Sequence, residues 1–171
     1  MFGLNYLKRK YRLFVINDLY VNQNTKKAFR KKRNCLQKLN NDNHIDKSVR
    51  IMGPLSSFCK LSIGAGTFIG RAFSCEGIGH ITIGKNCDIA PQVTILTGTH
   101  EFGDQNRRAG KGITTDVSIG DGCWIGACSI ILPGVCIGKG CIIGAGAVVT
   151  KDVPDNMRAV GIPAKFSPID D

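Results

Sequence analysis

The sequence lacks the features of a secreted, disulfide-linked protein and of a membrane-spanning one. Eight cysteines occur among the 171 residues, yet none of them forms a CxxC pair. The apolar run at residues 13–16 ends at Asn17 and Asp18, which makes it too short for a signal peptide or a membrane span. We therefore expect a cytoplasmic protein whose cysteines stay reduced.

Glycine is almost missing from the first 50 residues, and acidic residues are scarce there. Only Gly3 precedes residue 51, whereas the other 20 glycines follow it. The first 50 residues hold 13 Lys and Arg against 3 acids, and the remainder holds 10 against 10. The net charge of +10 therefore belongs to the first segment. This contrast predicts two different structures joined near residues 45–50.

A six-residue repeat dominates residues 119–153. Written in sixes, the stretch has an aliphatic first column: Ile119, Ile125, Ile131, Ile137, Ile143 and Val149. A second column, four places on, is small or β-branched: Cys123, Ser129, Val135, Cys141, Ala147 and Val153. A period of six fits neither a helix nor an alternating strand, because each row contains a short strand and a glycine-assisted corner. Three rows predict one coil, and coils must stack into a solenoid to bury their aliphatic columns.

The same frame extends backwards with one shift. Ile63 and Ile69 share a frame that slips by two residues at Ile83, so we expect a widened corner near residues 77–80. Four cysteines fall at the small inward place of a row, where a thiol packs as a small hydrophobe: Cys59, Cys87, Cys123 and Cys141. These positions favour packing over metal binding.

The repeat is interrupted once. No aliphatic column occurs between Ile95 and Ile119, so we predict that the solenoid ejects a loop over residues 99–116. Long irregular loops in compact domains are usually functional. His100 stands at the root of this one.

Residues 1–45 leave several interpretations open. Four apolar residues can share a helical face with Lys and Arg off it: Leu4, Leu7, Tyr11 and Phe14. A helical cap would close the open end of the solenoid. A basic amphipathic element would instead lie on an anionic surface at the inner face of the membrane. Nucleic-acid binding is the weakest alternative, because no recognised motif accompanies the charge, and we expect no such partner.

Four stretches resemble a known family. Their sequences are IGKNCDIAPQVTILTGTH at 83–100, IGDGCWIG at 119–126, IIGAGAVVTKDVP at 142–154 and GIPAK at 161–165. In these motifs the chain resembles the hexapeptide-repeat acyltransferases, in the branch of maltose, galactoside and polysaccharide O-acetyltransferases. The resemblance implies an all-β solenoid, a left-handed parallel β-helix over residues 46–154. A short basic, helical segment over residues 1–45 precedes it, and a C-terminal turn and tail over residues 155–171 follows.

The resemblance also implies an activity. It predicts a homotrimer with active sites between subunits, which transfers acetyl directly from acetyl-CoA to a hydroxyl of a sugar or surface-polysaccharide precursor without a metal. His100 would be the general base, since an imidazole can take the hydroxyl proton at neutral pH. Glu101, Asp104 or a backbone carbonyl would orient its ring, and the sequence does not decide among them. The backbone N–H of Ala127 would stabilise the oxyanion.

Further site residues follow from the same motifs. Those matching the coenzyme-binding positions are Trp124, Gly126, Ala127, Gly144, Ala145, Thr150, Lys151 and Lys165. Small residues at outward corners would let the pantetheine chain lie close to the backbone. Asn86, Asp88 and Asp104 are the candidate acceptor contacts. The N-terminal segment departs from the pattern of maltose and galactoside enzymes, which leaves the acceptor open.

Three other activities on this fold remain as alternatives. A sugar-nucleotide N-acyltransferase would use the same base on an amine. A serine acetyltransferase would carry a much longer helical N-terminal domain than 45 residues provide. A γ-type carbonic anhydrase would need a zinc site, but the spacing of His44, His80 and His100 does not suit one.

Overall fold

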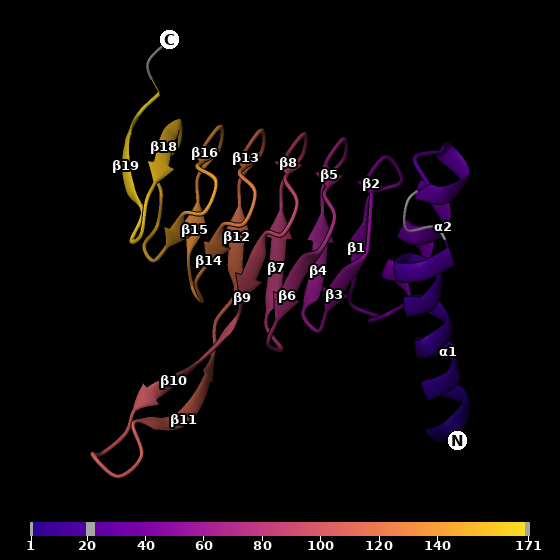
Figure 1. The fold of residues 1–171 in the computed structure, drawn as a ribbon, viewed down its shortest axis with the longest axis horizontal. Coiled ribbons are helices and arrows are strands. Elements are labelled where there is room, and N and C mark those ends of the chain that lie inside the picture. Colours follow the sequence, from indigo (N-terminus) through magenta and orange to yellow (C-terminus); the bar gives the residue numbers. More distant parts are fainter. Residues whose placement is uncertain (1, 20–22, 170–171) are drawn as a thin grey trace.

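The computed structural model describes residues 2–19 and 23–169, with side chains from Tyr6 onward. Its main body is a three-sided parallel β-helix (Figure 1). Sheet A contains β1 (His44–Ile45), β4 (Lys60–Ile63), β7 (His80–Ile83), β12 (Val117–Ile119) and β15 (Cys136–Ile137). Sheet B contains β2 (Arg50–Ile51), β5 (Phe68–Ile69), β8 (Asp88–Ile89), β13 (Trp124–Ile125), β16 (Ile142–Ile143), β18 (Met157–Val160) and β19 (Lys165–Pro168). Sheet C contains β3 (Leu55–Ser57), β6 (Phe73–Glu76), β9 (Thr94–Leu96), β14 (Ile130–Ile131) and β17 (Val148–Val149).

The aliphatic columns form the core of the β-helix, as the repeat predicts. Along sheet B, for example, Ile89 pairs with Ile125 and Ile125 pairs with Ile143, so that each isoleucine stacks on its counterpart in the next coil. All six residues of the small column from Cys123 to Val153 are also buried. No coil could bury these side chains alone, so each coil is stable only when it is stacked on its neighbours.

The three edges of the β-helix differ in length. From sheet A to sheet B, and from B to C, the inward residues of successive strands are always six apart, as in Ile119, Ile125 and Ile131. The edge from C to A varies. Cys75 and Ile83 are eight apart, Ile95 and Ile119 are 24 apart, and Val149 and Val153 are four apart. The predicted widened corner and the predicted loop therefore lie on the same edge.

The interruption of the repeat is an antiparallel hairpin. Strands β10 (Gly98–Phe102) and β11 (Ala109–Thr114) pair with each other, and their register shifts between His100 and Phe102. At the root, the N–H of Thr115 donates to the carbonyl of Thr97 at 2.9 Å. Figure 1 shows the hairpin leaving the β-helix and leaning toward the coils near the C-terminus.

Helices occupy the start of the chain. Helix α1 (Phe2–Phe14) continues into the short π-helix η1 (Val15–Leu19), and α2 (Lys26–Gln37) follows. Thr25 begins α2, because its hydroxyl oxygen accepts the N–H of Ala28 at 3.2 Å. Ala28 and Leu36, on one side of α2, are buried at the first coil. The side chain of Leu4 lies outside the described part. Among the described residues, the helices fall short of the length and apolar content that a membrane crossing requires.

The C-terminal segment differs from the predicted turn and tail. Strand β18 extends sheet B in parallel beside β16, and β19 returns antiparallel to β18. Ala159 takes the place that isoleucine holds in earlier coils, since it pairs with Ile143 and is fully buried. Because alanine is not part of the isoleucine and valine pattern, the repeat in the sequence ends before β18. Residues 170 and 171 lie outside the described residues.

Candidate functional site

His100 projects from β10 on the hairpin and is exposed. Its Nδ1 lies 3.0 Å from the carbonyl oxygen of Gly110 on β11. A carbonyl can only accept, so Nδ1 carries the proton in this contact. The lone pair of a neutral imidazole is then left on Nε2, which has no hydrogen-bond partner among the described residues. The ring is therefore held in the tautomer that a general base requires.

The orienting group is thus the Gly110 carbonyl, which was one of the alternatives left open by the sequence. Asp104 has a different task. Its carboxylate accepts the N–H groups of Asn106 at 2.8 Å and Arg107 at 3.1 Å, so it shapes the turn of the hairpin.

Gly112 lies directly across the hairpin from His100. A side chain added there would meet no heavy atom within 4 Å. Neither packing nor a left-handed backbone requires this glycine. Side chains directly opposite on paired strands share a face, so the absence of one at residue 112 leaves the space beside the imidazole open. No sequence signal marks Gly110 or Gly112, because the register of a hairpin is not written in its composition.

Trp124 lies on the outer surface of sheet B and is 58% exposed. It pairs with Asp88 on one side and with Ile142 on the other. The structure therefore brings two predicted site residues, Asp88 and Trp124, together. Asn86 lies at the preceding edge, between sheets A and B, in a left-handed conformation with φ of 53°.

Small residues line the edge between sheets B and C. The N–H of Gly126 donates to Ile143 and that of Cys128 donates to Pro91, at 2.8 and 3.0 Å. Between them, the N–H of Ala127 has no hydrogen-bond acceptor among the described residues. The same is true of Ala145, one coil later, within residues 23–169. This edge therefore carries two N–H groups, one above the other in successive coils, that lack an acceptor among the described residues.

The two glycines predicted at this edge have another role. A Cβ on Gly126 would lie 2.6 Å from the backbone nitrogen of Ala145, in the next coil. On Gly144 it would lie 2.7 Å from Cγ1 of Val160. The close approach of the neighbouring chain is therefore a packing reason for glycine at both positions, and the expectation that they make room for pantetheine stays a prediction.

The remaining coenzyme candidates lie toward the end of the chain. Thr150 and Lys151 are exposed on the edge between sheets C and A, and Lys165 is exposed on β19. The predicted site residues thus occupy the hairpin, one sheet and all three edges. One copy of the chain does not bring them all into one pocket.

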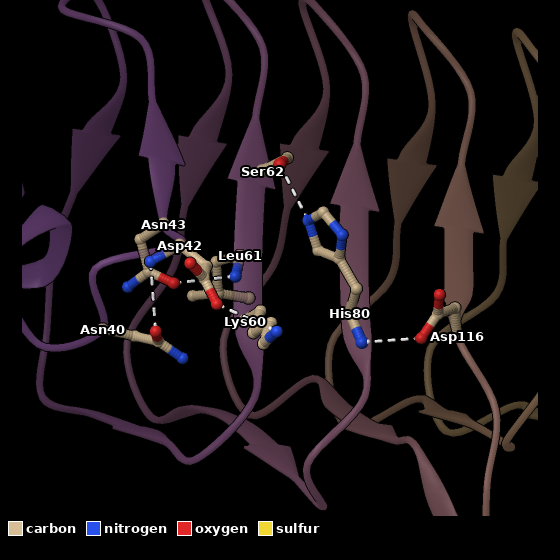
Figure 2. A network of polar contacts seen from close by, with 8 residues as sticks. All are labelled: Asn40, Asp42, Asn43, Lys60, Leu61, Ser62, His80 and Asp116. Carbon is tan, nitrogen blue, oxygen red and sulfur yellow. Dashed lines mark hydrogen bonds and ion pairs between the residues drawn. The ribbon is translucent and has the colours of Figure 1, made fainter.

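His80 belongs to a network of polar contacts on sheet A (Figure 2). Nε2 of His80 lies 2.8 Å from the hydroxyl of Ser62, and its backbone N–H donates to Asp116 at 2.8 Å. Beside them, Lys60 forms an ion pair with Asp42 at 2.9 Å. The ion pair ties the segment after α2 to the sheet, and the contacts of His80 join neighbouring coils. His44 pairs with Ser62 on the same sheet. Within the described residues, no three metal-ligating side chains come close enough to hold an ion.

The inward cysteines pack as predicted, and all eight cysteines are free. Each thiol of one column donates to a carbonyl of the following coil: Cys87 to Gly120 at 3.1 Å, Cys123 to Gly138 at 3.0 Å and Cys141 to Pro154 at 3.0 Å. A hydrogen bond with Cys87 and burial hold the pKa of the Cys123 thiol well above its usual range. Such a thiol stays protonated and inert.

Comparisons with known proteins agree with this architecture. The family model described as bacterial transferase hexapeptide (six repeats) matches residues 116–151. The crystal structure of a maltose O-acetyltransferase from Clostridium difficile 630 is 30% identical, with a TM-score of 0.74 over 97% of this chain and 88% of that one. A hexapeptide-repeat acetyltransferase from Vibrio cholerae, crystallised with acetyl coenzyme A, is 26% identical, with a TM-score of 0.77 over 98% and 88%.

Matches to curated relatives are shorter. The galactoside O-acetyltransferase of Escherichia coli is 42% identical over 85 residues, which are 50% of this chain and 42% of that protein. The chain spans about half the length of the curated relatives it matches, from 41% to 57% for the first three. Its likeness to the clostridial enzyme, in contrast, covers nearly the whole of both chains. The fold is the left-handed parallel β-helix, and the chain belongs to the hexapeptide-repeat acyltransferase family.

Proposed function

We propose that this chain is an acetyl-CoA-dependent O-acetyltransferase that acts on a hydroxyl of a sugar or glycan precursor, with His100 as general base. The observation that carries the proposal is the hydrogen bond from Nδ1 of His100 to the Gly110 carbonyl at 3.0 Å. It leaves the basic Nε2 free on an exposed hairpin. The open space at Gly112 lets an acceptor reach that nitrogen.

The transfer needs no covalent enzyme intermediate. Nε2 of His100 removes the acceptor's hydroxyl proton as the oxygen attacks the thioester carbonyl, and a carbon–oxygen bond forms. The N–H of Ala127 stabilises the resulting oxyanion. The carbon–sulfur bond then breaks, and the imidazolium returns its proton to the departing thiolate. The acetyl ester and the free thiol of CoA balance the reaction.

A groove for the acetyl-CoA donor runs along sheet B and its edges in this proposal. Trp124 forms its wall, and the stacked N–H groups of Ala127 and Ala145 lie along its floor. Thr150, Lys151 and Lys165 lie toward its phosphate end, where lysines act as point charges. Gly126 and Gly144 support these residues from below. The vibrio relative, which was crystallised with acetyl coenzyme A, supports this class of donor.

The distribution of the site supports the homotrimer that the family resemblance implies. His100 lies on a projecting hairpin, whereas Trp124 lies on sheet B and Ala127 on the edge beyond it. A site between neighbouring copies would bring the hairpin of one subunit to the groove of the next.

The acceptor is a sugar in this proposal, as the names of the clostridial and Escherichia coli relatives suggest. Asn86 and Asp88 would contact it, and Asp104 would act through the shape of the hairpin. The basic N-terminal helices favour a glycan precursor held at the inner face of the membrane, in a cytoplasmic enzyme.

Replacement of the base tests the proposal. His100→Ala should fold normally and still bind CoA, but lose about two to four orders of magnitude in turnover, the range expected for a general base. His80→Ala is the matched control, because that ring serves a structural network. Turnover is read from the thiol released by acetyl-CoA with a panel of sugars. A turnover of His100→Ala near that of the parent chain would rule out this mechanism.

The acceptor panel also separates oxygen from nitrogen transfer. Each sugar is offered together with its amino-sugar counterpart, and the product is treated with mild hydroxylamine, which cleaves esters and leaves amides intact. We expect a labile ester. A stable amide from the amino sugar alone would make the chain an N-acyltransferase.

A further inference from the structure

The two N-terminal helices differ in how much of their surface is buried. Helix α2 buries three side chains four residues apart, namely Ala28, Lys32 and Leu36, and the last of them joins the core of the β-helix. Helix α1 buries none of its described side chains, Tyr6 to Phe14. Figure 1 shows α1 lying across the end of the β-helix, with its N-terminal half extending beyond the coils. Capping of the solenoid is therefore achieved by α2 and the start of η1, and the outward side of α1 is exposed.

The outward side of α1 is apolar. Leu7, Tyr11 and Phe14 are four and three residues apart, so they share one side of the helix. Their exposed fractions are 62%, 63% and 48%. The opposite side faces the β-helix, where the guanidinium of Arg9 lies 5.8 Å from the ring centre of Phe58. An amphipathic helix normally turns its apolar stripe inward, and α1 turns it outward.

Positive charge surrounds this stripe. A cavity of about 400 Å³ between α1 and α2 is lined by the cationic side chains of Lys8, Arg12, Lys31 and Lys38. Tyr11 borders both the cavity and the stripe. Asp18 is the only acid in residues 1–41. The surface therefore joins exposed aromatic and aliphatic groups to a cluster of amines and guanidinium groups.

We propose that this surface docks on an anionic lipid bilayer. Leu7, Tyr11 and Phe14 enter the interface between headgroups and acyl chains, and Lys8 and Lys31 meet the lipid phosphates. The same surface of a second copy fits poorly, since face-to-face contact would set like charges against each other. A nucleic acid would use the cations but leave the apolar stripe exposed. The proposal stands apart from acetyl transfer, because binding is measured without either substrate.

Co-sedimentation with vesicles tests the proposal on the full chain. We expect binding to vesicles of phosphatidylcholine with 30% phosphatidylglycerol, and at least tenfold weaker binding to pure phosphatidylcholine. Lys8→Glu with Lys31→Glu should weaken the anionic binding at least 25-fold, given about fivefold per charge removed near the headgroups. Leu7→Ser with Phe14→Ser should weaken it at least tenfold.

Matched controls carry the same changes elsewhere. Lys85→Glu with Lys139→Glu alters two exposed lysines of the β-helix, and Ile78→Ser alters an apolar side chain that is 77% exposed. Equal binding to anionic vesicles and to pure phosphatidylcholine vesicles would overturn the proposal. An equal loss of binding in the control variants would also overturn it. So would a smaller oligomer for the Leu7 and Phe14 variant by light scattering, since the stripe would then be a contact between copies.

Discussion

The coils of the β-helix and the segments added to them follow opposite rules. In the coils, inward positions repeat and nearly every inward aliphatic side chain is buried. In the hairpin β10–β11 no residue is buried, and in α1 none of the described side chains is. Yet the hairpin holds His100 and α1 holds the candidate docking surface. The repeated coils form the core, and the departures from the repeat carry the residues proposed for catalysis and docking.

The largest expected effect comes from removal of the hairpin. Deletion of residues 98–115 removes 18 residues and restores the six-residue step between Ile95 and Ile119. The β-helix should still fold, because Thr97 and Asp116 then form an ordinary corner, whereas acetyl transfer should fall below detection. Circular dichroism and thiol release measure the two outcomes. Unfolding of the deletion variant would mean that the hairpin is part of the scaffold.

A pair of isoleucines sharpens the same contrast. Ile125 is fully buried in sheet B, and Ile113 is half-buried on β11. Ile125→Ala should lower the free energy of unfolding by about 2 to 5 kcal/mol, because it leaves a cavity in the stacked column. Ile113→Ala should lower it by less than about 1 kcal/mol. Urea unfolding of both variants checks this, and equal losses would contradict the division.

Lys32, on α2, contacts the first coil of the β-helix. Its ionisation should make the free energy of unfolding depend on pH. Its side chain is buried, and Nζ donates to the Met52 carbonyl at 2.5 Å. Burial, aided by the charge of Arg71, lowers the pKa of Lys32 from 10.5 to about 8. Below pH 8 both folded and unfolded chains carry this charge, so folding bears the full cost of burying it. Between pH 8 and 10.5 only the unfolded chain keeps the proton, so this cost fades as pH rises.

The contribution of Lys32 to stability should therefore grow by about 3 kcal/mol between pH 8 and 10.5. Other groups titrate there too, so the comparison is with Lys32→Met, which should lack this rise. Lys31→Met, at an exposed neighbouring position, should retain it. Unfolding midpoints at pH 7.5, 9 and 10.5 decide the matter. Parallel pH curves for Lys32→Met and the parent chain would contradict the assignment.

The smallest effect concerns Gly112, whose missing side chain keeps the face beside His100 open. Gly112→Val should fold normally and raise the KM for the acceptor about tenfold, which corresponds to roughly 1.4 kcal/mol of lost binding. The KM for acetyl-CoA should change little. Thr99→Val, next to His100 on the other face of β10, is the matched control. An unchanged acceptor KM would show that substrate approaches His100 from another side.

Much of this architecture could be predicted because each coil carries its own signal. The isoleucine column, the two-residue slip before Ile83 and the interruption after Ile95 are all visible in the sequence. The partner of His100 was not, because the cross-strand neighbour Gly110 depends on the register shift within the hairpin. Strand β18 was missed because Ala159 replaces the expected isoleucine.

The coenzyme candidates divide in a similar way. Outward placement of Trp124 could be predicted from its position between the inward columns. The role of Gly126 could not, because a short contact with Ala145 arises only when two coils are stacked. A motif names the residues of a site, but it does not say which of them touch the ligand and which support their neighbours.

The variable edge between sheets C and A has a practical consequence. Two of the three edges keep a constant step, so a change of length there would displace every later inward residue. The third edge already accommodates steps of four, eight and 24 residues. Residues 77–79, in its eight-residue step, form a natural insertion point for a peptide tag or a fluorescent protein. A reporter placed there would lie one coil before the hairpin, beside its root at Thr97, and would leave both other edges intact.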